Sequence, residues 1–134
     1  MTDRGPVIPP GHETAYERFQ FAPAFRVDDT AYVSGVIGRN TQGEVPENPE
    51  AEYEAVFAGL EHILRAAGGS LADIVELTSF HTDFPTTMGL FMKAKRAAFA
   101  VPFPAWTAIG CTALTEPGAR VEVKATAVLR RASP

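Results

Sequence analysis

The chain has 134 residues, of which 46% are apolar and 21% are charged, and its formal net charge is −4. This length suits one domain of roughly 100 to 150 residues with its own core, and the composition excludes a disordered or fibrous protein. Twelve Lys and Arg scattered among sixteen acids do not form the clustered basic face of a nucleic-acid binder, so no nucleic-acid partner is expected.

The N-terminal segment carries three prolines, at positions 6, 9 and 10. Proline supports neither a helix interior nor a sheet ladder, so residues 1–18 are predicted to form an extended arm, followed by a single domain over residues 19–134. Residues 1–10 lack the basic-then-apolar order of a signal peptide, and no apolar stretch approaches the ~20 residues that span a bilayer. We therefore expect no membrane association and a cytoplasmic location.

Two strands and a helix are predicted for the first half of the domain. Strand-forming residues run from Phe19 to Phe25 and from Thr30 to Gly35, with a short turn between them, which is typical of a hairpin. Apolar residues from Tyr53 to Ala67 then recur at steps of three and four, which predicts an amphipathic helix. Gly68 and Gly69 follow and end it.

The second half alternates in the same way. A strand is predicted over Ile74–Thr82 and a helix over Thr87–Ala100, whose Lys93, Lys95 and Arg96 are expected to face outward. Two further strands are predicted over Ala105–Thr112 and Arg120–Leu129. The last of these alternates cleanly, with apolar residues from Val121 on one face and Glu122, Lys124, Thr126 and Val128 on the other.

The expected order is therefore ββαβαββ, which places the chain in the α+β class. Two amphipathic helices are only enough to cover one face of such a sheet. The other face must meet water or pack against another subunit, and its density of Phe and Val favours homo-oligomerisation.

Neither a disulfide nor a metal centre is expected. Cys111 is the only cysteine, and its small apolar neighbours indicate a half-buried hydrophobic side chain. The three histidines, at positions 12, 62 and 81, have no metal-ligand spacing. The sequence thus predicts no metal and no other cofactor.

Five segments, in this order, resemble the reactive intermediate deaminase family (RidA, YjgF-type). They are Phe21–Val27, Ala31–Gly35, Leu64–Ser70, Phe103–Ala105 and Val121–Ala127. The resemblance implies a chorismate-mutase-like α+β fold with a mixed sheet, assembled as a homotrimer with clefts for a small molecule between subunits. It also implies cofactor-independent hydrolysis of small 2-enamino or 2-imino acids to 2-keto acids and ammonia.

The resemblance also assigns candidate site residues. Glu122 stands at the position of the glutamate that positions or activates water, and Ser34 and Gly35 keep the close backbone approach of the second strand. Trp106 stands where active deaminases carry an arginine that grips the substrate carboxylate with two parallel hydrogen bonds. The remaining positions implied to bind substrate are Phe21 in place of a tyrosine, Val36 in place of a glutamine, Phe91 near an expected asparagine, and Thr107.

Each of these departures replaces a polar side chain by an apolar one. An indole N–H is one neutral donor and cannot replace a guanidinium opposite a carboxylate. Trp106 either lines the cleft as an aromatic wall or fills the subunit interface. Arg39, in the loop after the second strand, is a candidate for a displaced carboxylate clamp.

Two functions fit this pattern. The first is a divergent hydrolase of a small enamine, imine or related reactive metabolite, with Glu122 activating water in an apolar pocket. The second is a non-catalytic trimer that binds a small ligand or a partner. Ribonuclease activity, which older names in the family mention, gains no support from the charge pattern.

Overall fold

The computed structural model describes residues 3–130, which fold around one six-stranded sheet in the order β1-β2-β3-β6-β4-β5. All neighbours in it are antiparallel except β4 and β5, which are parallel, so the sheet is mixed. The strands are β1 (Arg4–Val7), β2 (Ala24–Val27), β3 (Thr30–Ile37), β4 (Ile74–His81), β5 (Ala105–Gly110) and β6 (Val121–Val128). The helices are α1 (Glu13–Phe19), α2 (Pro49–Ala66) and α3 (Met88–Ala98), with a 3-10 turn, η1, at Leu71–Asp73. The predicted α+β class is confirmed.

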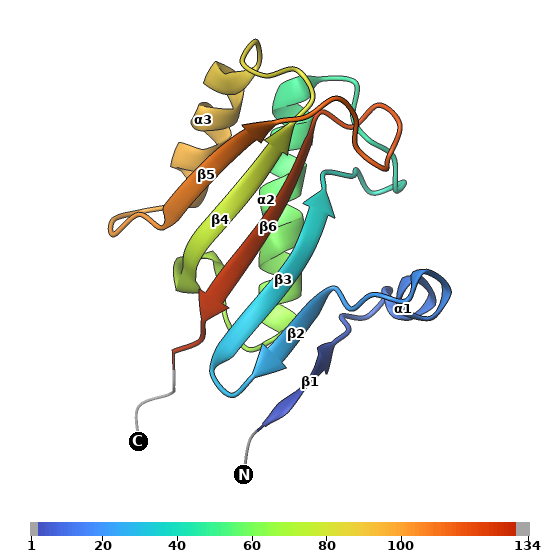
Figure 1. The fold of residues 1–134 in the computed structure, drawn as a ribbon, viewed down its shortest axis with the longest axis vertical. Helices are drawn as coiled ribbons and strands as arrows, with labels where there is room; N and C mark the ends of the chain where they lie inside the picture. The colour runs from blue at the N-terminus through green and yellow to red at the C-terminus, as the bar shows by residue number, and fades with distance from the viewer. Residues whose placement is uncertain (1–2, 131–134) are drawn as a thin grey trace.

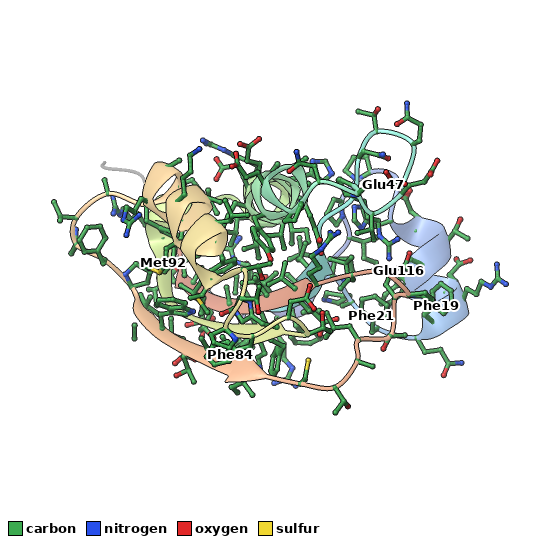
Figure 2. The ribbon with its side chains drawn as sticks, turned by 90° about the horizontal axis from the view of Figure 1, so that it is seen from above. Phe19, Phe21, Glu47, Phe84, Met92 and Glu116 are labelled. Atoms are coloured by element: carbon green, nitrogen blue, oxygen red, sulfur yellow. The ribbon has the colours of Figure 1, made fainter. Side chains whose placement is uncertain are left out.

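Helices α2 and α3 pack together on one face of the sheet, as the view from above shows (Figure 2). Helix α2 begins where the sequence places a strong start signal, because the Asn48 side chain accepts hydrogen bonds from the backbone N–H groups of Glu50 and Ala51, and Pro49 opens the first turn. It ends before Gly68, which has a φ of 96° that glycine adopts without strain.

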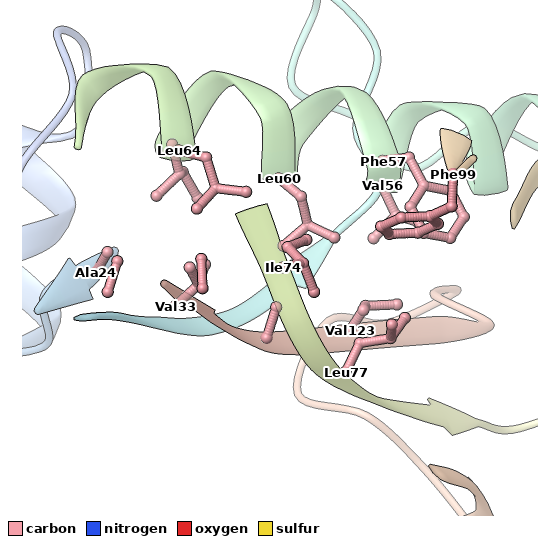
Figure 3. Packing of buried hydrophobic residues seen from close by; sticks show 14 of the residues in the cluster. Ala24, Val33, Val56, Phe57, Leu60, Leu64, Ile74, Leu77, Phe99 and Val123 are labelled. Carbon is pink, nitrogen blue, oxygen red and sulfur yellow. The ribbon is translucent and has the colours of Figure 1, made fainter. Parts of the chain in front are cut away.

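The core lies between these helices and the sheet. Leu60 and Leu64 of α2 point toward the strands, and the strand residues that alternate inward meet them (Figure 3). Burying a side chain of this size contributes about 1.5–3 kcal/mol relative to exposure, so this layer supplies most of the protomer's stability. The fully buried members are Ala24, Ala31, Tyr53, Val56, Leu60, Leu64, Phe91, Val121, Val123 and Ala127.

The N-terminal segment differs from the expected extended arm. Arg4–Val7 forms the edge strand β1, paired with β2, and Glu13–Phe19 forms the short helix α1, which lies to the side of the sheet (Figure 1). Pro6 is tolerated because an edge strand can turn the position of its missing N–H toward solvent. Phe19, predicted to begin a strand, instead ends α1, and Gln20 with a φ of 59° redirects the chain toward β2.

The face of the sheet opposite the helices, here called the open face, carries apolar side chains. Tyr32 of β3 is 53% exposed, Val128 of β6 47%, and Ile109 of β5 41%. They lie on three strands, with polar residues such as Lys124 and Thr126 between them, and exposed apolar side chains on one sheet face favour an interaction surface. Thr107 of β5 lies on the same face, because it alternates with the inward-facing Trp106.

Candidate functional site

A bulge in β3 brings Gly35 against Glu122. Val33 pairs with Ala125 and Val36 with Val123, so Ser34 and Gly35 together oppose one residue of β6. The Glu122 side chain lies over Gly35 on the open face, where a Cβ on residue 35 would stand 2.6 Å from Oε2 of Glu122. Glycine is therefore required here for the carboxylate to take its place.

The Glu122 carboxylate is half-buried and unpaired. Within residues 3–130 it takes part in no ion pair and no side-chain hydrogen bond. A carboxylate has acceptor sites on both oxygens, so this one is free to bind a water or a ligand N–H. Of the two charged site residues expected from the sequence, Glu122 and Arg39, it is the one that has no ion-pair partner.

Ser34 serves the backbone rather than chemistry. Its hydroxyl donates to the carbonyl of Ala22 at 2.7 Å, and its N–H donates to the carbonyl of Pro23 at 2.9 Å. These bonds tie β3 to the loop that carries Phe21, which is exposed next to α1 (Figure 2). Ser34 thereby fixes the bulge, which includes Gly35, against the segment that follows Phe21.

Trp106 lies on the opposite face of the sheet, beneath α3. Its indole N–H donates to the Ser79 hydroxyl at 2.8 Å, and its ring is 6.0 Å from that of Phe91, centroid to centroid. The Lys95 ammonium stands 4.6 Å from the centre of the same indole. Both the donor and one face of Trp106 are thus occupied within the protomer.

Phe91 and Val36 face the interior rather than a ligand surface. Phe91 is fully buried and contacts the rings of Tyr53, Phe57 and His81 as well as Trp106. Val36 points from β3 toward α2 and stands against Gly59. Phe91 can therefore influence a ligand only through its contact with the Trp106 ring.

Ser79 and His81 form a polar chain with Trp106 that the sequence did not indicate. His81 Nε2 lies 2.8 Å from the Ser79 hydroxyl, and both residues are buried, so the three side chains form one polar chain inside the apolar layer. Burial lowers the pKa of His81, which keeps its imidazole neutral at pH 7. The available signal was the two-residue spacing of polar positions along β4, which puts 79 and 81 on one face.

This buried histidine makes stability depend on pH. Below its ordinary pKa of 6.5, the unfolded chain binds a proton that the folded chain resists, so we expect stability to be full above about pH 6.5 and to fall as the pH drops toward the lowered pKa. Urea midpoints measured from pH 8 to pH 5 should fall less steeply in a His81→Gln variant. His12, whose pKa is lowered by burial and by His62, has the same sign and remains in both proteins. Equal slopes would remove His81 as the cause.

Arg39 is held in an ion pair. Its guanidinium donates to Glu116 at 2.8 Å and to the carbonyl of Gly43 at 3.3 Å, and the contact with Arg39 lowers the pKa of Glu116. Glu116 lines an open pocket of about 610 Å³ between the loop 43–47 and the loop before β6. To clamp a carboxylate, Arg39 would have to leave Glu116, so it remains a prediction without a free guanidinium to support it.

Six of the nine residues expected from the sequence therefore fall into two groups. Glu122, Gly35 and Thr107 belong to the open face, whereas Trp106, Phe91 and Val36 belong to the face under the helices. The sheet separates the groups, so one protomer does not bring Glu122 and Trp106 to the same ligand. A site that uses both needs surfaces from two protomers.

Among residues 3–130, no group of three or more His, Cys, Asp or Glu side chains is arranged to hold a metal ion. None of the helices in this described range is long and apolar enough to cross a bilayer.

Comparison with known proteins finds related sequences and structures that match most of the chain. The family model described as Endoribonuclease L-PSP matches residues 13–129. The RutC family protein YjgH of Escherichia coli K12 is 34% identical over 113 residues, covering 84% of this chain and 86% of that protein. The 2-iminobutanoate/2-iminopropanoate deaminase of Dermatophagoides farinae is 29% identical over 114 residues, covering 81% and 85%. A solved structure of protein YjgH superposes with a TM-score of 0.85 at 33% identity, covering 96% of this chain and 98% of that one.

Proposed function

Since the chain belongs to the RidA/YjgF family, we propose that it is a divergent hydrolase of a small enamine or imine, acting in a cleft between subunits. A relative named as a 2-iminobutanoate/2-iminopropanoate deaminase supports this class of substrate. The reaction adds water across the C=N bond and then releases ammonia, leaving a carbonyl product. It needs a base for water and a proton for the leaving nitrogen, and no redox partner.

The observation that carries the proposal is the unpaired Glu122 carboxylate over Gly35. In the proposed reaction it accepts a proton from the attacking water as the oxygen bonds to the imine carbon. The same carboxyl group returns that proton to the nitrogen, which gives a carbinolamine, and then carries the hydroxyl proton to the amino group as the C–N bond breaks, so that ammonia leaves and the carbonyl forms. An ion-paired carboxylate would be a weaker base, so the absence of a cationic partner within residues 3–130 favours this role.

The proposed cleft is completed by a second protomer, in a homotrimer. Two features support this assembly: Glu122 and Trp106 lie on opposite faces of one sheet, and the open face exposes Tyr32, Ile109 and Val128. Burying such side chains between subunits would remove apolar surface from water. Light scattering checks the assembly, and a stable monomer would refute the shared cleft.

A non-catalytic ligand-binding trimer is the second candidate, and the position of Trp106 favours it. The indole donor is already bonded to Ser79, so this side chain cannot take over the two-pronged grip of an arginine on a carboxylate. Such a protein would retain the cleft and bind a ligand without turnover. An assay of ammonia release distinguishes the two candidates.

The assay measures ammonia release from 2-iminobutanoate and from 2-aminoacrylate, the enamine tautomer of 2-iminopropanoate, both generated in the reaction mixture. Enzyme-dependent release by the wild type is expected under the hydrolase proposal, at a rate that exceeds spontaneous hydrolysis in water. Release that appears only in a Trp106→Arg variant would instead mean that the native substrate has changed. Absence of release from both proteins would favour the binding protein.

Gly35→Ala tests whether the position of the Glu122 carboxylate matters. The added methyl would collide with the carboxyl end of Glu122, a flexible group that can swing away, so the free energy of unfolding should change by less than about 1 kcal/mol. The displaced carboxylate should lower kcat by roughly tenfold or more. Unfolding curves and ammonia release measured on the same preparation check both, and an unchanged kcat would exclude a role for this geometry.

A further inference from the structure

Two histidines far apart in the sequence come together between the N-terminal segment and helix α2. His12 lies in the turn that precedes α1, and His62 lies on α2, yet their ring centres are 5.7 Å apart and the ring planes are tilted by 32°. The pairing arises only from the tertiary structure, so it left no spacing signal in the sequence. It puts imidazole groups from two separate elements within reach of one ligand.

Neither imidazole has another polar partner. Within residues 3–130, no hydrogen bond and no ion pair involves a ring nitrogen of His12 or His62, whereas Nε2 of His81 is occupied by Ser79. His62 is exposed and His12 is half-buried, so a solute can reach both rings from solvent. Imidazole is the commonest protein ligand of transition metals, and two free imidazoles at one place offer the start of a coordination shell.

The turn that carries His12 is held by its own contacts. The His12 N–H donates to the carbonyl of Pro9 at 3.0 Å, and the Glu13 carboxylate accepts from the N–H of Gly11 at 3.0 Å. Pro9 is fully buried, so the turn packs on the rest of the protomer. His12 is therefore presented from a fixed backbone, and His62 from a long helix, which lowers the entropy cost of bringing the two rings to one ion.

The separation of the rings fits a tetrahedral ion. Zinc binds imidazole nitrogen at about 2.1 Å, and in tetrahedral geometry the centres of two imidazole rings on one zinc ion lie about 5.2 Å apart. On adjacent octahedral positions the same centres would lie about 4.5 Å apart. The observed 5.7 Å is closer to the tetrahedral value. Rotation about the soft χ2 torsion of each histidine can turn one nitrogen of each ring toward a common ion.

We propose that His12 and His62 bind one Zn²⁺ ion, which joins the turn before α1 to α2. Water completes the coordination, since no third His, Cys, Asp or Glu among residues 3–130 is arranged around the pair as a further ligand. Two protein ligands are fewer than the three or four of established zinc sites, so we expect a Kd on the order of 10–100 μM. The site involves neither Glu122 nor the hydrolysis proposed above, and it differs from the metal-free chain expected from the sequence.

Isothermal titration calorimetry of the untagged full-length protein with zinc chloride tests the site, and one ion per chain is expected. His12→Gln and His62→Gln should each raise the Kd roughly tenfold or more, because either change breaks the chelate. The double variant should then bind no more than about threefold more weakly than either single variant. Equal Kd values in the wild type and the single variants would overturn the proposal. So would two ions per wild-type chain, one of which each single variant loses, because the histidines would then bind zinc separately.

The matched controls address other zinc ligands. Cys111 is a free, partly exposed thiol and could bind zinc by itself, so Cys111→Ser should leave the Kd within about twofold of the wild type. Loss of zinc binding in this variant would place the ion at Cys111 and overturn the proposal. Mg²⁺, which prefers oxygen ligands, should give no saturable heat, and equal binding of Mg²⁺ would show a nonspecific cation effect in place of a histidine site.

Trypsin cleavage after Arg18 shows whether the ion joins the two elements. No residue of α1 is buried and Arg18 is exposed near its end, so cleavage depends on local opening of this segment. Zinc at about ten times its Kd should slow the cleavage roughly threefold or more in the wild type, because it lowers the population of the open form. The effect should be less than about twofold in His62→Gln. Equal slowing in both proteins, or none in the wild type, would overturn a zinc bridge between the turn and α2.

Discussion

We expect the Glu122→Gln protein to release ammonia from 2-iminobutanoate roughly 100-fold or more slowly than the wild type, because an amide cannot take a proton from water. Glutamine has nearly the same shape as glutamate, so it can occupy the same space over Gly35 without a new collision. The change removes basicity while it leaves packing in place. The loss should therefore appear in kcat, with little change in the urea midpoint.

A matched control lies on the same face of the sheet. Glu76 of β4 is an exposed carboxylate that accepts a hydrogen bond from Thr126 at 3.1 Å, and Glu76→Gln should leave kcat within about twofold of the wild type. If Glu122→Gln retained full kcat, Glu122 would not be the general base, and another residue would have to activate the water. Equal losses in both variants would point to a field effect of charge on the open face rather than to a specific base.

Glu52→Ala should produce the largest loss of stability, about 3–5 kcal/mol, because it breaks a buried ion pair from one side. The Glu52 carboxylate is fully buried in α2 and accepts from the Arg120 guanidinium at 2.7 Å. It also accepts from the backbone N–H groups of Arg120 at 2.7 Å and Val121 at 3.3 Å. Alanine would leave the two backbone donors without their buried acceptor and would remove the carboxylate from Arg120, whose guanidinium keeps only the carbonyls of Pro46 and Glu47 as hydrogen-bond partners.

Urea unfolding at one fixed protein concentration checks this prediction, because association would otherwise shift the midpoint. Glu54→Ala is the control, since Glu54 is exposed on the same helix and should change the free energy of unfolding by less than about 0.5 kcal/mol. A loss below about 1 kcal/mol in Glu52→Ala would show that the pair is solvated in solution. Because these bonds hold the start of β6, Glu52→Ala should also make the position of the neighbouring Glu122 side chain less fixed.

Local pattern was sufficient where one face of a segment packs on the core and the other face lies toward solvent. Strand β6 alternates so regularly that the exposed side of Glu122 followed from its spacing, and α2 follows from its apolar stripe and the Asn48 start signal. Residues 3–19 lacked such a pattern. Strand β1 exists only through its pairing with β2, which no local property of Arg4–Val7 indicates.

Residue type was misleading where tertiary contacts outweigh it. Lys95 was assigned to the outside of α3 because it is charged, although its spacing from Phe91 and Phe99 is that of the inner stripe. A long side chain can lie along an apolar surface and place its ammonium on an aromatic ring, so charge alone does not decide which way a helical residue points. Ser79 and His81 were missed for the related reason that a buried polar residue depends on a partner distant in sequence, here the Trp106 N–H that donates to Ser79.

By itself, the sequence determined that this is an α+β chain of the RidA/YjgF family with an apolar residue, Trp106, where active deaminases carry an arginine. Only the tertiary structure decided that Glu122 stands unpaired over Gly35, and that Trp106 lies across the sheet from it with its donor bonded to Ser79 and Lys95 on its face. The physical reason is the separation along the sequence between the residues that interact. Backbone periodicity is set by neighbours a few residues apart, whereas the partner of a charge or a donor is set by which strands and helices pack together.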